Sequence, residues 1–183
     1  MNALTLCDSN RLTEVVSQCH QRLDDLFLLH QEAVLLGRFD KAMQLLNCFK
    51  ELHHLHMRFE DEKLIPKLDG IDDRGRWPAS LYTDEHAKVR DLMGKTETRL
   101  RSLGKDQLSS KELRRQIIVF LDEEKTFKGL REHHQEREEA GMLLELDNQT
   151  GNNWRVSTIK PFMNAWSDCM ERNMAIVNGV ELP

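Results

Sequence analysis

The apolar residues near the amino terminus recur at the spacing of one face of a helix. Between residues 10 and 36 they fall three, four or seven positions apart, as a single buried helical stripe requires. The stripe consists of Val16, Leu23, Phe27 and Val34. Ser9 precedes it as a candidate N-cap, and Gly37 follows it as a left-handed stop. The pattern predicts a first helix from about Asn10 to Leu36.

Two further segments of helical period follow. The second begins near Phe39 and continues until the sequence D-G-I-D-D-R-G-R-W-P, whose glycines and proline interrupt it. The third extends from about Ala79 to Leu103, and we expect Gly104 to end it. The short breaks between these segments predict helices that lie next to one another.

The carboxyl-terminal part of the chain predicts two more helices. Ser109 precedes Glu112 by three positions, which is the sequence of a capping box, and a helical pattern then extends to about Leu146. After the loop N-Q-T-G-N-N, a shorter fifth helix is predicted from about Val156 to Val177.

These five segments predict an all-α fold, an up-down-up-down four-helix bundle with an extra C-terminal helix. We assign residues 1–150 to the bundle and residues 151–183 to a helical extension packed on it. The composition agrees, because 31% of residues are charged and only 6% are aromatic. Strands favour aromatic and β-branched residues, whereas long helices tolerate many charged ones.

Charge and cysteine content narrow the classes of partner. A net charge of −5 does not provide the basic face that a nucleic-acid partner requires. No apolar run approaches the ~20 residues that a membrane-spanning helix needs. The four cysteines form no CxxC motif, and the first ten residues have no signal-peptide pattern. We therefore expect a cytoplasmic protein that contacts neither nucleic acid nor membrane.

One phrase occurs twice in the chain. H-M-R-F-E-D-E-K-L-I-P-K-L-D begins at His56, and H-H-Q-E-R-E-E-A-G-M-L-L-E-L-D follows much later. In each copy a histidine precedes a glutamate by four positions, as His56 precedes Glu60 and His134 precedes Glu138. Residues four apart share one side of a helix, and the apolar stripes pass through both histidines. Facing buried carboxylates are costly, so we expect a cation between them.

A second repeat supplies two more histidines. C-H-Q-R-L-D-D-L-F around His20 parallels E-H-A-K-V-R-D-L-M around His86, each with an aliphatic residue three positions after the histidine. Each half of the chain thus contributes one histidine from its first helix and a His-x-x-x-Glu from its second. The predicted metal ligands are His20, His56, Glu60, His86, His134 and Glu138. Imidazoles with carboxylates suit iron or manganese, and zinc stays open.

This order of residues resembles the hemerythrin-like, or HHE cation-binding, family between about Leu12 and Asp147. The phrase E-D-E-K-L-I-P-K-L is similar to the family's acidic cluster, and D-E-H to its Glu-His pair. The resemblance implies two iron ions with an oxo or hydroxo bridge. It also implies that the four histidines are terminal ligands and that Glu60 and Glu138 bridge the irons. Oxygen-carrying members have a further histidine one turn away on the third helix, where this chain has Tyr82 or Arg90.

The resemblance implies a non-haem di-iron protein that binds or senses O2, NO or peroxide. Two alternatives stay open. One is a di-iron enzyme that repairs iron–sulfur clusters by donating iron, or that consumes peroxide or NO. The other is a regulatory interaction module that responds to metal through the fifth helix. The expected partner is a small diatomic molecule or peroxide, and a homodimer through the fifth helix is also open.

Several polar residues near the predicted site have more than one interpretation. His53 is either a fifth ligand, a residue that orients a ligand, or a buried histidine with ordinary hydrogen bonds. Tyr82 either reaches the metals or packs in the core. His134 is favoured over His133 as a ligand because only His134 has a glutamate four positions later. Glu139 either faces solvent or hydrogen-bonds to a ligand.

Overall fold

The computed structural model describes residues 9–71, 76–103 and 109–178, and every element in these ranges is helical. The prediction of an all-α fold is confirmed. The elements, in chain order, are α1 (Leu12–Leu35), α2 (Phe39–Phe59), η1 (Glu60–Leu64), α3 (Ile65–Asp69), α4 (Ala79–Ser102), α5 (Ser110–Arg137), η2 (Glu138–Met142), α6 (Leu143–Gln149) and α7 (Asn152–Asn178). The two η elements are π-helical turns, so α2 and α5 each continue through a π turn into a short helix.

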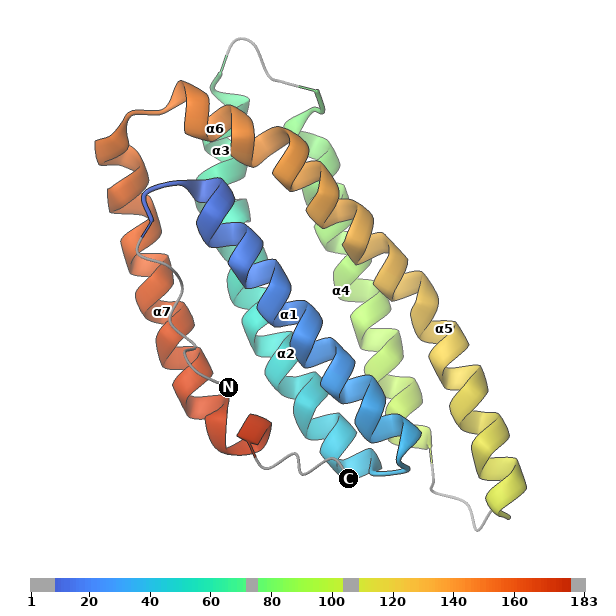
Figure 1. The fold of residues 1–183 in the computed structure, drawn as a ribbon. Coiled ribbons are helices and arrows are strands. Elements are labelled where there is room, and N and C mark those ends of the chain that lie inside the picture. Colours follow the sequence, from blue (N-terminus) through green and yellow to red (C-terminus); the bar gives the residue numbers. More distant parts are fainter. Residues whose placement is uncertain (1–8, 72–75, 104–108, 179–183) are drawn as a thin grey trace.

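The long helices lie side by side in a bundle-like arrangement (Figure 1). Helix α1 packs against α2 and α5, and α4 packs against the same two helices, so the core lies between all four. Aromatic rings from three of them meet in that core. Phe27 lies 5.3 Å from Phe49 and 5.5 Å from Phe127, measured between ring centroids. All three rings are buried.

The helix ends confirm some predictions from the sequence and correct one. Gly37 has a φ of 68°, which is the left-handed conformation expected after α1. Ser109 and Glu112 form the predicted capping box at the start of α5. Ser9 is not the N-cap of α1, because the helix begins at Leu12 and its capping carboxylate comes from the distant Asp147. The Gly104 prediction lies outside the described residues.

Asp147 caps α1 through both of its carboxylate oxygens. The backbone N–H of Leu12 donates to Oδ1 at 2.8 Å, and the backbone N–H of Thr13 donates to Oδ2 at 3.1 Å. Helix N-termini favour a carboxylate because their first N–H groups have no partner within the helix. This contact attaches the end of α6 to the start of α1.

Helix α7 begins at Asn152, earlier than the predicted start near Val156, and at 27 residues it is longer than α1. Its amino-terminal turns extend through the loop-like sequence N-N-W, and Pro161 lies inside the helix. It packs against α2 and α1 on the outside of the other long helices (Figure 1). The ring of Phe162 stacks on Phe59 of α2 with centroids 4.1 Å apart. Within the described residues, none of the helices combines the length and apolar character needed to span a membrane.

Candidate metal centre

The two repeated glutamates each begin a π turn. Glu60 is the first residue of η1 and Glu138 is the first residue of η2. The backbone N–H of Ile65 donates to the Glu60 carbonyl, and that of Leu143 donates to the Glu138 carbonyl, five residues back in both cases. A π turn contains one residue more than an α turn, and such turns are frequent at functional sites. The sequence repeat is therefore also a repeat of backbone geometry.

The structure brings all six predicted ligands together in the interior. None of them is more than 3% exposed. They come from α1, α2, η1, α4, α5 and η2 in the order His20, His56, Glu60, His86, His134 and Glu138. We call these residues the six-residue cluster.

Each glutamate of the six-residue cluster directs one oxygen to each half of the chain. Glu60 places Oε1 3.3 Å from His56 Nε2 and Oε2 3.2 Å from His86 Nε2. Glu138 places Oε2 3.0 Å from His20 Nε2 and Oε1 2.6 Å from His134 Nε2. Both carboxylates therefore lie between the two pairs of imidazoles, which is the arrangement that a bridging carboxylate has.

The donor atoms form two groups of four, and the atoms of each group lie within 4.8 Å of one another. We call them the first-half position (His20, His56, Glu60 and Glu138) and the second-half position (Glu60, His86, His134 and Glu138). Both groups use both glutamates. Each position could hold one metal ion, and the shared carboxylates would connect the two ions.

The polar atoms at the centre of the cluster lack hydrogen-bond partners. Both carboxylate oxygens of Glu60 and of Glu138 lie 2.6–3.3 Å from imidazole nitrogens but form no hydrogen bond within the described residues, and neither does Nε2 of His86 or of His134. A buried polar atom without a partner costs roughly 1–3 kcal/mol, and a charged one costs more. Metal ions bound at these atoms would satisfy them, so the donor set fits a metal pair.

The electrostatics of the cluster also require positive charge at its centre. Burial lowers the pKa of His20, but contacts with Glu138 and Glu139 outweigh burial and raise it to about 9. The pKa of His86 is raised to about 10 by Glu138 and Glu60, again against burial. Burial opposes ionisation of Glu138, yet contacts with His134 and His20 hold its pKa well below the ordinary value. Glu138 thus keeps its negative charge because His134 and His20 lie beside it, and a divalent cation would supply the same positive charge.

Three carboxylates hold the outward nitrogens of the cluster's imidazoles. Glu139 Oε1 lies 2.7 Å from Nδ1 of His20. Asp61 Oδ1 lies 2.6 Å from Nδ1 of His86. A carboxylate at Nδ1 fixes the tautomer and turns Nε2 towards a metal. The sequence left the role of Glu139 open, and the structure assigns it to His20.

The third carboxylate, Glu85, was missed by the sequence analysis, as was Asp61. Glu85 Oε2 lies 2.9 Å from Nδ1 of His134, and Arg137 holds its other oxygen at 2.5 Å. One signal was present in the sequence for Asp61, because it directly follows Glu60 just as Glu139 directly follows Glu138. For Glu85 the signal was the D-E-H motif, in which it directly precedes His86.

The residues with open interpretations take distinct places. His53 is buried and belongs to neither group of donors, and its Nδ1 has no hydrogen-bond partner in the described part of the chain. Burial lowers its pKa well below the ordinary value, and the nearby His56 and Arg131 add to this effect. His133 lies on the surface beside Glu136, so the structure favours His134 as predicted.

Tyr82 supports the backbone of η2. Its hydroxyl donates to the carbonyl of Arg137 at 3.4 Å and accepts the backbone N–H of Met142 at 3.3 Å. It therefore bridges two backbone groups that lie five residues apart. Burial raises the pKa of Tyr82 to about 12, so the hydroxyl keeps the proton that it donates. Gly141 lies close by, because a Cβ there would come within 2.9 Å of the Tyr82 hydroxyl.

The chain matches no family model, no curated protein and no solved structure. Its class is therefore defined by the fold and the cluster. It is an all-helical protein with a bundle-like arrangement and two adjoining groups of buried side chains that could hold metal ions.

Proposed function

We propose that the six-residue cluster binds two iron ions and that the protein is a hemerythrin-like protein that binds or senses O2, NO or peroxide. The fold would then be an up-down-up-down four-helix bundle, with α7 as the appended helix. The observation that carries the proposal is the position of Glu60 and Glu138, each of which directs one oxygen to each pair of imidazoles. Bound as a ferrous pair, the metals would supply an exchangeable position for a small oxidant.

The choice of iron rests on the donor chemistry. The site offers four imidazoles and two carboxylates and no cysteine. Iron and manganese suit such a donor set better than they suit a set of thiolates. Two bridging carboxylates in a helical core are typical of di-iron proteins. Zinc and manganese are the alternatives that elemental analysis would separate from iron.

The role of this chain's residues is to hold the metals, orient their ligands and exclude water. Apolar residues one helical turn from the candidate ligands are fully buried, namely Val16, Leu23, Leu52 and Val89. Such a lining keeps bulk water from the metals and admits small, weakly polar molecules such as O2 and NO more readily than large substrates. This supports binding or sensing over turnover of an organic substrate.

Anaerobic loading with Fe(II) tests the proposal. We expect two iron ions per chain by elemental analysis and a change in the near-ultraviolet spectrum after addition of O2, NO or hydrogen peroxide. Glu60→Ala should abolish both. Glu62→Ala is the matched control, because Glu62 lies in the same π turn but is exposed. Two bound irons without a response to any of the three molecules would end the oxidant-binding proposal and leave the metal centre standing.

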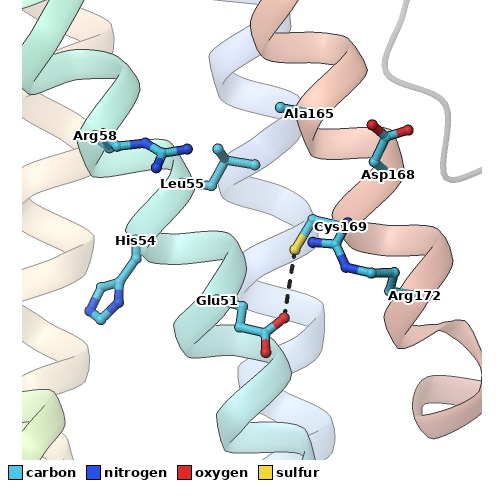
Figure 2. Close-up of a pocket in the computed structure, with 8 residues that line it drawn as sticks. All are labelled: Glu51, His54, Leu55, Arg58, Ala165, Asp168, Cys169 and Arg172. Carbon is cyan, nitrogen blue, oxygen red and sulfur yellow. Dashed lines mark hydrogen bonds between the residues drawn. The ribbon is translucent and has the colours of Figure 1, made fainter.

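A metal-responsive interaction module is a second candidate. Helix α2 carries His56 and, with α7, also forms a groove of about 600 Å³. Figure 2 shows Glu51 of α2 and Cys169 of α7 facing each other across this groove, with Arg172 near them and Arg58 further along α2. Metal binding would change the rigidity of α2 and hence of this surface. Limited proteolysis checks it, because iron should change the cleavage rate within residues 151–183.

A further inference from the structure

The two metal positions have matched inner donors. Each takes two imidazoles from one half of the chain and one oxygen from each glutamate. The carboxylates that hold His20 and His86 are matched as well. Glu139 and Asp61 each directly follow a bridging glutamate, and each holds the Nδ1 of the first histidine of the other half, at 2.7 and 2.6 Å. Both positions therefore have a carboxylate on the first histidine, although Asp61 is also held by Arg90.

The contacts of the second histidine in each half are not matched. In the second half, His134 Nδ1 lies 2.9 Å from Glu85, a carboxylate that is 4% exposed and is held by Arg137. In the first half, His56 Nδ1 is buried and has no hydrogen-bond partner among the residues that the structure describes. The second-half position therefore has both outward nitrogens held by carboxylates, and the first-half position has one.

The sequence repeat explains this difference. Glu85 directly precedes His86 on α4, and the residue that directly precedes His20 on α1 is Cys19. In the second half, Glu85 stands directly before the first histidine and contacts His134 on α5, the following long helix. In the first half a buried thiol stands at the same place, so no carboxylate is available there for His56.

We infer that the two cation positions differ in affinity, with the second-half position binding its ion more tightly because Glu85 positions His134. This inference rests on the proposed metal centre. A carboxylate at Nδ1 fixes the ring and raises the basicity of Nε2, and loss of such a partner lowers metal affinity by about 10- to 100-fold. The first-half position, where His56 lacks this partner, is the position that empties and exchanges.

Titration of the metal-free protein with Co(II) tests the inference, with binding followed by calorimetry and by the visible spectrum of the bound ion. Two binding steps of different affinity would not by themselves support the inference. Two cations that share carboxylates repel each other, so the second ion binds more weakly even if the positions are equal. The deciding variant is Glu85→Gln. It should weaken the tighter step by about 10- to 100-fold and leave the weaker step nearly unchanged. Glu132→Gln, an exposed residue of α5, should change neither step.

A second variant approaches the same question from the other half. Cys19→Glu places a carboxylate where His56 lacks a partner and should tighten the weaker step, provided that circular dichroism shows a native helix content. If this variant does not fold, Glu85→Gln still decides. Weakening of the weaker step by Glu85→Gln, or no change in either step, would overturn the inference. Failure of the wild type to bind Co(II) or Fe(II) would instead overturn the proposed function.

Discussion

Within the ranges that the structure describes lie two buried groups of histidine and glutamate, and they differ in how their polar atoms are satisfied. The first is the six-residue cluster. The second is the pair of His30 in α1 and Glu124 in α5, neither of which is more than 1% exposed. His30 donates from Nδ1 to the carbonyl of Ala42 at 2.9 Å, and its Nε2 lies 2.8 Å from Glu124 Oε1. Gln31 donates to the other Glu124 oxygen at 3.1 Å.

The comparison separates a structural use of these residue types from a candidate binding site. Every ring nitrogen of His30 and every carboxylate oxygen of Glu124 has a partner within the chain, so nothing further is needed there. In the six-residue cluster the carboxylate oxygens of Glu60 and Glu138 lie 2.6–3.3 Å from imidazole nitrogens but form no hydrogen bond within the described residues. Both groups contain buried histidine and glutamate. The carboxylate oxygens without hydrogen bonds in the six-residue cluster are therefore the feature that indicates a ligand there.

The largest expected difference between the two groups is in metal binding. Glu138→Ala removes one donor from both positions, because both use this glutamate. We expect binding of two ions per chain to fall to none that survives gel filtration. Glu124→Gln is the matched control and should retain both ions. Elemental analysis of the two purified variants measures this, and equal metal loss in both would contradict the comparison.

Metal removal should have the next largest effect. A ligand present at 1,000 times its dissociation constant stabilises the native state by about 4 kcal/mol. Two ions, each present at that excess over its own dissociation constant, would contribute about 8 kcal/mol, and we therefore expect a chelator to lower the free energy of unfolding of the wild type by about that amount. The increment should persist in Glu124→Gln and vanish in Glu138→Ala. Urea unfolding with and without chelator measures it; an increment that Glu138→Ala retains would place the metal elsewhere.

The sequence predicted the parts of this centre that depend on local periodicity. The stripes through His56 and His134 placed both histidines inside, and the repeated phrase paired each with a glutamate. The structure brings the six side chains together as expected, and their binding of metal stays a prediction. The repeat had this predictive value because residues four apart must share a helical face.

Features that depend on the packing of distant segments were not predicted. Asp147 caps α1 from 135 residues away along the chain, and Asp61 reaches a histidine on another helix. The Asp147 contact has no local sequence signal, and the repeat that places Asp61 after Glu60 does not show which helix Asp61 reaches, since both contacts depend on the register between helices. The π turns at Glu60 and Glu138 were not predicted either. One extra residue in a turn changes the helical period too little to be seen in a pattern of apolar positions.

The backbone of η2 offers a finer test of the difference between the two groups. A Cβ at Gly141 would lie 2.8 Å from a ring carbon of Trp77, whereas a Cβ at Gly129 in α5 would meet nothing within 4 Å. We expect Gly141→Ala to destabilise the protein by about 1–3 kcal/mol through overpacking and to weaken metal binding. Gly129→Ala should instead stabilise the helix by up to about 1 kcal/mol. Thermal unfolding and metal titration distinguish them, and stabilisation by both would contradict the packing.

The smallest expected effect is that of Tyr82→Phe. The ring keeps its packing, but the carbonyl of Arg137 and the N–H of Met142 lose the hydroxyl that connects them. Because these hydrogen bonds are long, we expect a loss of about 1 kcal/mol in the free energy of unfolding, with a small decrease in metal affinity. Gln31→Ala removes a hydrogen bond of the His30–Glu124 pair and should reduce stability by a similar amount without changing metal affinity. A decrease in metal affinity in Gln31→Ala but not in Tyr82→Phe would mean that the bridge across η2 does not help to position Glu138.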